Sequence, residues 1–369
     1  MKCKLYKLAM TSGLMLSFQT NAVTVYDKDN MRLSLAGKIK AKYYFSDAKQ
    51  FNGDKTHILL GIRGDTKINE KLNGFAYWQY DFRGNKPENS LVSDSTRIAY
   101  VGFAFDSFHQ FDYGRNYGIL NDIELWTASV IPEFGGWAYG SVDNFMAYRT
   151  NNVATYRNKN GFGLSEQLKF ALQVQGKSNG DNNREDQIDM RRVGYRSVSH
   201  QNGTGVGGSL TYEFENNLTV GASFMSSERT EEQKKDGKGA RANGWNLGGR
   251  YDDGVYYLAA IYAETNNLTY VGAKEGFARK NRAFEITAQY LFSNGLKPSI
   301  AYQRGMGDKL NTGDYDIVNY LDIALIYNIN LNFSVVAEYR LNLLKDNEFT
   351  KENSMVTDDT LNLTLAYTF

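Results

Sequence analysis

Residues 116–150 read NYGILNDIELWTASVIPEFGGWAYGSVDNFMAYRT and join two short alternating segments, Gln110–Arg115 and Asn152–Arg157. Hairpin connections usually have roughly 2–5 residues, so this connection is exceptionally long. A loop of this length is functional or disordered, and its aromatic residues argue against disorder: Trp126, Phe134, Trp137 and Tyr139. We therefore predict that the loop folds back into a cavity that the neighbouring strands enclose.

The segments on both sides of this loop alternate between apolar and polar residues. In the first segment, Leu33, Leu35, Ile39, Ala41 and Tyr43 alternate with Ser34, Lys38, Lys40 and Lys42. Successive side chains of a strand point to opposite faces. The pattern therefore predicts strands with one apolar face and one hydrated face.

The connections between these segments are alternately long and short. The long connections are 46–55, 84–94, 116–150, 176–204, 230–242, 266–281, 305–316 and 345–358. The short turns are 69–71, 106–108, 160–161, 215–217, 252–254, 293–295 and 328–332. Eight long loops and seven turns predict an all-β fold, a 16-stranded antiparallel transmembrane β-barrel with an inward-folded third loop. A soluble β-sandwich gives no reason for every long loop to lie at one end.

The first 22 residues have the pattern of an export signal. Three lysines precede the mostly apolar run Leu8–Phe18, and a small-residue cleavage pattern ends at Ala22. Cleavage there removes the only cysteine, Cys3, and leaves residues 23–369 as a single barrel domain. Without the three lysines, 39 of the 42 basic residues remain against 41 acidic ones, a formal net charge of −2.

The composition narrows the class of protein further. A charge this close to zero indicates no nucleic-acid partner, and after Phe18 no uninterrupted apolar run approaches the ~18 residues of a membrane-spanning helix. The chain nevertheless contains 26 Tyr, 21 Phe and 35 Gly at a mean hydropathy of −0.50. This combination is typical of a membrane barrel, whose apolar face uses only alternate residues.

The chain ends in an alternating segment, Leu361–Phe369, whose last residue is aromatic. An uncovered apolar edge strand is an aggregation hazard in a soluble protein. In a barrel, this segment closes against the first strand, Leu33–Tyr43. We therefore predict that the terminal strand closes the barrel. Its terminal aromatic, with apolar residues at alternate positions before it, also resembles the sorting signal of outer-membrane barrels.

Six stretches carry a more specific signal: Phe111–Gly118, Pro132–Gly136, Val153–Asn158, Pro298–Tyr302, Val318–Tyr320 and Leu361–Phe369. Together they resemble the trimeric general porins of Gram-negative outer membranes, along essentially all of residues 23–369. The resemblance implies a homotrimer that contacts outer-membrane lipids and lipopolysaccharide. It also implies passive diffusion of ions and small hydrophilic solutes, with no cofactor. A barrel of about 16 strands is too wide for side chains to fill, which supports a water-filled channel.

In that family, a basic cluster on the wall faces carboxylates on the third loop. By resemblance, Lys38, Arg97 and Arg149 fall on the basic positions and Glu133 on an acidic one. This chain departs from the family pattern at two positions. Leu59 stands where a further arginine is usual. The position of the family's second loop carboxylate falls near Ala128–Ser129, where this chain has no acidic residue. Candidates to compensate are Asp122 and Glu124 on the acidic side, and Lys40, Lys42, Arg63 and Arg115 on the basic side.

The resemblance also implies a latch between subunits. Glu88 lies in the second long loop, at a position that in similar porins reaches over the neighbouring subunit toward arginines, including the one matched by Arg115. We expect a Glu–Arg pair there to hold the loop geometrically, with a modest net energy.

Three alternative functions remain open from the residues alone: a substrate-preferring channel, an outer-membrane enzyme, and a passive structural or adhesive barrel, which a large conductance in planar bilayers would exclude. Trp126 and Trp137 either pack the loop against the wall or offer an aromatic surface to a sugar ring, which would make the channel prefer certain substrates. An outer-membrane enzyme needs a nucleophile, base and orienting group in mutual reach. None of the three histidines, His57, His109 and His200, lies near a nucleophile-elbow pattern. The sequence shows no metal-ligand spacing or cofactor motif.

Overall fold

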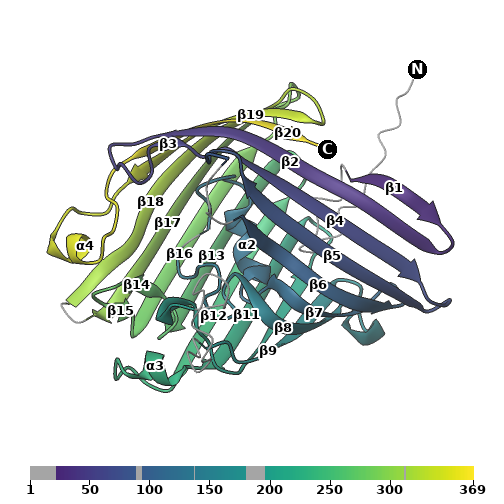
Figure 1. Ribbon diagram of the computed structural model, residues 1–369, viewed down its shortest axis with the longest axis horizontal. Coiled ribbons are helices and arrows are strands. Elements are labelled where there is room, and N and C mark those ends of the chain that lie inside the picture. Colours follow the sequence, from purple (N-terminus) through teal and green to yellow (C-terminus); the bar gives the residue numbers. More distant parts are fainter. Residues whose placement is uncertain (1–21, 89–93, 137, 180–195, 311–312) are drawn as a thin grey trace.

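The computed structural model describes residues 22–88, 94–136, 138–179, 196–310 and 313–369. Within them, sixteen long antiparallel strands form the wall: β2 (Met31–Phe45), β4 (His57–Lys67), β5 (Leu72–Arg83), β6 (Ser95–Phe105), β7 (His109–Tyr117), β8 (Arg149–Asn158), β9 (Leu168–Gln175), β10 (Gly205–Glu213), β11 (Leu218–Glu228), β12 (Arg241–Asp252), β13 (Tyr256–Asn266), β16 (Lys280–Tyr290), β17 (Leu296–Leu310), β18 (Gly313–Asn328), β19 (Phe333–Asn342) and β20 (Thr360–Thr368). Because β2 pairs with both β4 and β20, the sheet closes on itself. Figure 1 shows this closed ring from the side.

The shorter elements lie at the ends of the wall or inside it. They are β1 (Val23–Lys28), β3 (Gly53–Asp54), the hairpin of β14 (Tyr270–Gly272) and β15 (Gly276–Phe277), the helices α2 (Asn121–Ala128), α3 (Glu231–Lys234) and α4 (Glu348–Glu352), and the 3-10 turns η1 (Gly161–Gly163) and η2 (Val198–His200). No helix in the described ranges is long and apolar enough to cross a membrane.

The predicted alternation of long loops and short turns is confirmed everywhere except at residues 305–316. The elements β3, α3, β14, β15 and α4 belong to long connections and lie at one end of the molecule in Figure 1, opposite the turn between β1 and β2. The long loop predicted at 305–316 is wrong, because β17 and β18 continue through most of it. Leu310, Ile317 and Val318 pack there against Phe349 of α4, which stabilises the extended hairpin.

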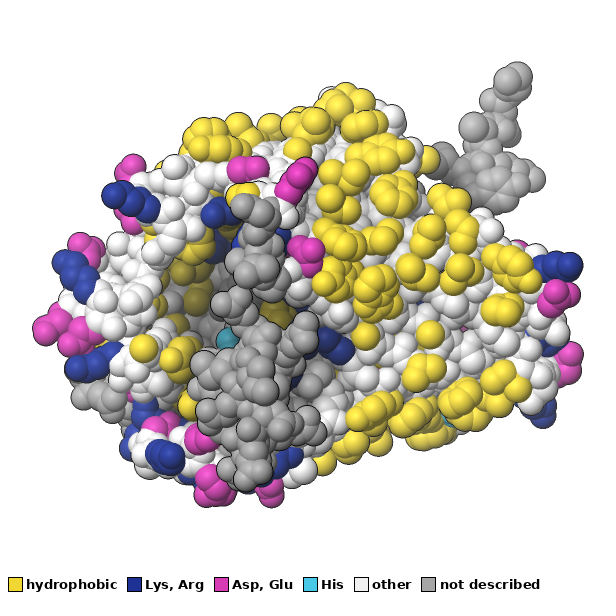
Figure 2. Space-filling model, viewed as in Figure 1, with side chains coloured by type: hydrophobic (Ala, Val, Ile, Leu, Met, Phe, Trp, Pro, Cys, Tyr) yellow, Lys and Arg dark blue, Asp and Glu magenta, His cyan; other side chains and the backbone are white. Residues whose placement is uncertain are grey.

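The two faces of the wall differ in the way the alternation predicts. Exposed apolar side chains point outward, among them Val101, Phe103, Leu172, Val174, Leu363 and Leu365. Polar side chains at the intervening positions point inward and are shielded there, among them Gln79, Asp81, Asn246, Asp322, Glu338 and Asn362. Figure 2 shows hydrophobic side chains over the outer faces of the strands and charged side chains toward both ends. An apolar outside and a polar inside suit a strand wall between lipid and water.

The closure of the barrel uses the last residue of the chain. The backbone N–H of Gly37 donates to the carbonyl oxygen of Phe369 at 2.8 Å, and the N–H of Phe369 donates back at 2.9 Å. A Cβ atom on Gly37 would lie 2.2 Å from the Phe369 ring, so only glycine leaves space for that ring. The prediction that the terminal strand closes against the first strand is confirmed.

Candidate functional site

The third long connection, Gly118–Tyr148, enters the barrel between β7 and β8. Its two arms are joined at their base, where the N–H of Gly118 donates to the carbonyl of Tyr148 at 2.7 Å and that of Leu120 to Met146 at 3.2 Å. A Cβ on Gly118 would lie 2.2 Å from the Met146 backbone, so glycine permits this close approach. Figure 1 shows α2, which this loop carries, inside the ring of strands.

Helix α2 is held against the inner wall by apolar contacts. Its side of the contact comprises Ile119, Leu120, Ile123 and Trp126, which are buried in the largest apolar cluster of the described residues. The wall beneath has small residues: Cβ atoms on Gly207, Gly221, Gly244 and Gly248 would each lie within 3.1 Å of one of these side chains. This docking surface was not predicted from the sequence, although glycine at inward-facing positions of three consecutive strands was a signal for it.

Trp126 packs the loop against the wall, which favours the first of its two interpretations. Only 7% of its surface is exposed. The Arg250 guanidinium lies 5.6 Å from its ring centre, and the hydroxyl of Tyr257 donates to its carbonyl oxygen at 2.6 Å. Trp137 lies outside the described residues.

Asp122 and Glu124 do not join a carboxylate cluster facing the lumen, so their predicted compensating role is revised. The guanidinium of Arg157 binds both oxygens of Asp122, at 2.8 and 3.0 Å, and Ser209 donates to it at 2.6 Å. Glu124 is only 1% exposed, and neither of its carboxyl oxygens has a hydrogen-bond partner among the described residues. Both side chains therefore belong to the docking of α2.

The loop tip, Pro132–Gly136, is fastened to the opposite part of the wall by Glu133. The ammonium groups of Lys40 and Lys42 lie 2.5 and 2.6 Å from its two carboxylate oxygens, and the hydroxyl of Tyr44 donates to it at 3.2 Å. Its backbone N–H donates to Glu338 at 3.1 Å. Burial opposes ionisation of Glu133, but the two lysines outweigh it and lower its pKa to about 2. Glu133 is therefore ionised at neutral pH.

Phe134 provides a second anchor for the tip. Its carbonyl oxygen accepts hydrogen bonds from Gln303, at 2.8 Å, and from Arg340. The Arg340 guanidinium also lies 4.8 Å from the Phe134 ring centre and pairs with Asp322 at 2.8 Å. Nothing in the local sequence indicated these partners, because they lie on β17, β18 and β19, more than a hundred residues away.

The three predicted basic residues lie on the strand wall: Lys38 on β2, next to the lysines that hold the tip, Arg97 on β6 and Arg149 on β8. Arg97 receives support from Gln79, whose side-chain oxygen accepts its hydrogen bond at 3.0 Å, and from Asp81 at 3.6 Å. Arg149 lies close enough to Arg97 for the two charges to repel each other. Lys38 follows the same face as Lys40 and Lys42, because alternate residues of β2 point inward.

The structure thus brings Glu133 into contact with Lys40 and Lys42, which the sequence predicted only as supplementary basic residues of the constriction. The uncharged Leu59 pairs in register with Lys38 on one side and Asp81 on the other. Leu59 therefore lies between the lysines of β2 (Lys38, Lys40 and Lys42) and the pair Arg97 and Asp81. The family pattern has a further arginine at the position of Leu59.

Glu88 and Arg115 do not meet within one chain. Glu88 is exposed in its loop. The guanidinium of Arg115 binds both carboxylate oxygens of Asp143, at 2.6 and 3.1 Å, at the base of the third loop. Their predicted pairing concerns a contact between subunits, which a single chain does not contain.

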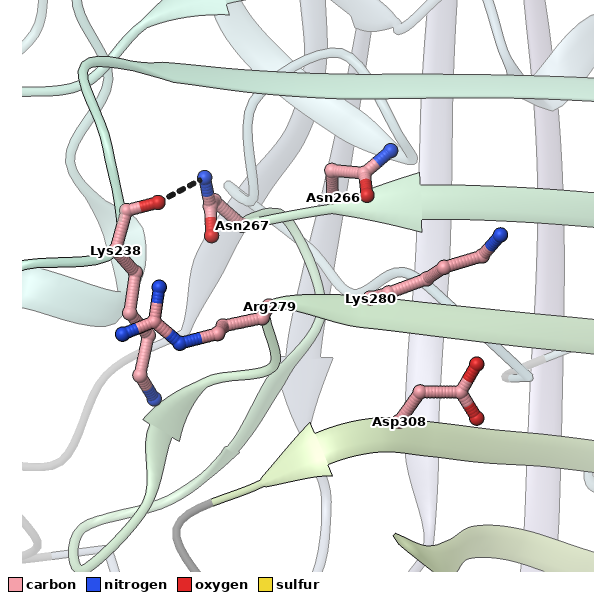
Figure 3. Close-up of a pocket in the computed structure, with 6 residues that line it drawn as sticks. All are labelled: Lys238, Asn266, Asn267, Arg279, Lys280 and Asp308. Carbon is pink, nitrogen blue, oxygen red and sulfur yellow. Dashed lines mark hydrogen bonds between the residues drawn. The ribbon is translucent and has the colours of Figure 1, made fainter.

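A pocket of about 580 Å³ lies at the loop end, away from the loop tip. Lys238, Asn266, Asn267, Arg279, Lys280 and Asp308 line it, as Figure 3 shows. Most of its charges are used in local pairs: Lys238 with Glu275, Lys280 with Glu264 and Asp308 with Arg282. We therefore assign it no function beyond joining the external loops. The described residues contain no group of three or more His, Cys, Asp or Glu side chains placed to hold a metal ion.

Comparison with known proteins places this architecture in context. A family model described as Gram-negative porin matches residues 28–369. The chain is 40% identical to outer membrane protein F of Serratia marcescens, with 97% of each chain covered. It is 43% identical to outer membrane porin protein OmpD of Citrobacter koseri, with both chains covered completely. Among solved structures, Salmonella typhi OmpF in complex with daunomycin has a TM-score of 0.84 and 35% identity, with 94% of this chain and 100% of that chain covered.

Proposed function

This chain belongs to the Gram-negative porin family, and on that premise we propose that its loop Gly118–Tyr148 forms the constriction of the channel. The chain is an outer-membrane porin, a passive diffusion channel. Sixteen strands enclose more space than their inward side chains fill, so water occupies the lumen. The inserted loop then sets the narrowest section, and the charges around it act on each passing solute.

The attachment of Glu133 to Lys40 and Lys42 is the observation that carries this proposal. Two ion pairs of 2.5 and 2.6 Å, with the Phe134 anchor beside them, hold the loop tip at a fixed position inside the barrel. A loop held at both its helix and its tip narrows the lumen permanently. Lys38, Arg97 and Arg149 form the basic side of this constriction.

The membrane and oligomeric setting follow from the family and from the outer surface. We propose that residues 1–22 are removed on export, that three copies assemble, and that Glu88 of one subunit reaches toward Arg115 of the next. The apolar outer faces contact outer-membrane lipid and lipopolysaccharide wherever they are not covered by another subunit. The relatives are channels, and we propose no catalytic role.

Liposome swelling distinguishes a general sieve from a sugar-preferring channel. We expect uptake of neutral sugars to fall steadily with their size and to be equal for stereoisomers of one size, because Trp126 is buried. Faster uptake of one stereoisomer would contradict the general-sieve proposal. Trp126→Phe is the matched variant, because it keeps an aromatic ring in the packed position while changing its outline. We expect this variant to leave the size dependence unchanged.

A further inference from the structure

Three successive inward-facing positions of β2 carry lysines, Lys38, Lys40 and Lys42. Among the described residues of the loop, only the carboxylate of Glu133 pairs with them. Lys40 and Lys42 each bind one oxygen of Glu133, and Lys38 lies near enough to interact with the same charge. An ionised carboxylate between two ammonium groups leaves the cluster positive rather than neutral. The loop carboxylate is therefore masked from solutes by the wall lysines.

The remaining charges in electrostatic reach of this cluster do not reverse its sign. Glu338 accepts the backbone N–H of Glu133, but it is buried, and Asn362 also donates to it at 2.9 Å. Arg340 and Asp322 cancel each other at 2.8 Å. Counting Glu338 as fully ionised, the three lysines still exceed the two glutamates.

The second group on the lumen wall adds to the same excess. Arg97 lies 3.6 Å from one carboxylate, that of Asp81, and Arg149 lies near enough to Arg97 for the two positive charges to repel each other. Both the lysine cluster of β2 and the pair Arg97 and Arg149 therefore present excess positive charge to the lumen. Of the acidic residues elsewhere in the loop, Asp122 pairs with Arg157 and Asp143 with Arg115, whereas Glu124 is buried against the wall, away from the lumen water.

We propose that this constriction prefers anions, and that Lys40 and Lys42 determine the preference by masking the carboxylate of Glu133. This inference rests on the proposed placement of the loop tip in the constriction, and it deepens that proposal by naming the favoured solutes. These are small hydrated anions such as chloride, phosphate and short carboxylates. They are attracted to the excess ammonium and guanidinium groups without forming a permanent complex, because the lumen water screens the interaction over ~8 Å at physiological salt.

The test is the reversal potential of the full-length trimeric protein in planar bilayers, measured in a potassium chloride gradient at low salt. We expect a chloride-to-potassium permeability ratio above one for the wild type. Lys40→Met and Lys42→Met should each lower this ratio, because each removes a positive charge and uncovers Glu133. Lys67→Met is the matched control, because Lys67 is also paired with a glutamate, at 2.8 Å, but lies at the exposed end of β4.

A charge-compensated variant separates the mechanism from general disturbance of the loop. Lys40→Met combined with Glu133→Gln removes one charge of each sign, so its permeability ratio should return close to the wild-type value. Heat-modifiable mobility on gels checks that each variant is folded, and Lys40→Arg, which keeps the charge, should behave as wild type.

Three outcomes would overturn the inference: a cation-preferring wild type, equal effects of Lys40→Met and Lys67→Met, or no compensation in the double variant. These outcomes are distinct from failure of the proposed channel itself. A protein that inserts without any stepwise conductance would contradict the proposed function, whereas a conducting but cation-preferring protein would contradict only the anion preference.

Discussion

Glu133 illustrates how single residues act in this channel. Its position in the loop predicted a carboxylate facing a basic wall, and the structure places it in direct contact with Lys40 and Lys42. A unit charge acting on an ion about 4 Å away in water contributes about 1 kcal/mol, which corresponds to roughly fivefold in permeability at most. Single substitutions at the constriction should therefore shift selectivity measurably without abolishing conductance.

We expect Glu133→Gln to shift the reversal potential toward anions and Arg149→Ala to shift it toward cations. The reason is the loss of one negative or one positive charge at the constriction, and both shifts should be largest at low salt, where screening is weakest. Glu70→Gln, in an exposed turn, is the control for the first variant. If neither substitution moves the reversal potential, Glu133 and Arg149 do not lie at the constriction.

Glu124 should make the docking of the loop depend on pH. Burial, reinforced by repulsion from Glu285, raises the pKa of Glu124 well above its usual range. An acid with a raised pKa stabilises the docked loop most below its unfolded pKa of about 4.3, and this stabilisation is lost as pH rises through the folded value. We expect open-channel current noise in the wild type to increase as the pH is raised from acidic to alkaline values.

Glu124→Gln should remove most of that increase, because the amide is neutral throughout the range and has a similar shape. Glu166→Gln, an exposed carboxylate in a turn, should leave the increase unchanged. Identical pH dependence in all three proteins would show that Glu124 does not control the loop.

At the level of elements, the strand wall was predictable and the interior of the loop was not. Two-residue alternation and the alternation of long and short connections depend on local sequence, and both are confirmed, apart from the connection predicted at 305–316. Helix α2 was missed because it has only eight residues, and a helix this short depends on packing for its stability. The same limit applies to the site: Lys38, Arg97 and Arg149 follow from matched positions, whereas the contacts of Glu133 and Phe134 join distant strands.

The closure between β2 and β20 carries a prediction about assembly. Phe369→Ala removes the ring that covers Gly37 but keeps the two backbone hydrogen bonds. We expect a lower yield of protein in the outer membrane, because the terminal aromatic also belongs to the proposed sorting signal. The molecules that do assemble should have nearly unchanged single-channel conductance. Quantitative immunoblots of membrane fractions measure the yield.

Phe292→Ala is the control for that experiment, because Phe292 is an exposed aromatic residue next to a different turn. An unchanged yield of Phe369→Ala under strong expression would count against a role of the last residue in sorting.

At the scale of the whole molecule, the outer face of the barrel provides the surface for contacts between subunits. We propose that lipid or a neighbouring copy covers the exposed apolar side chains of the wall. The proposed latch adds a polar contact at the loop end, from Glu88 toward Arg115. Since Arg115 is already bound by Asp143, the latch must share or replace that partner.

We therefore expect Glu88→Ala to lower the temperature at which the trimer separates in mild detergent by a modest amount, without preventing its assembly. Glu70→Ala, at the opposite turn, should not change it. Native mass spectrometry at increasing temperature measures both the assembly of the trimer and the temperature at which it separates. A wild type that is only monomeric would contradict the oligomeric proposal.

The central claim is that sixteen strands enclose a water-filled channel that the loop Gly118–Tyr148 narrows. Single-channel conductance in the presence of neutral polymers of increasing size tests it most directly. We predict stepwise conductance that scales with the conductivity of the salt solution. Small polymers should lower this conductance by entering the lumen, and polymers above a sharp size limit should leave it unchanged. An absence of conductance steps, or a conductance that no polymer size affects, would contradict the account.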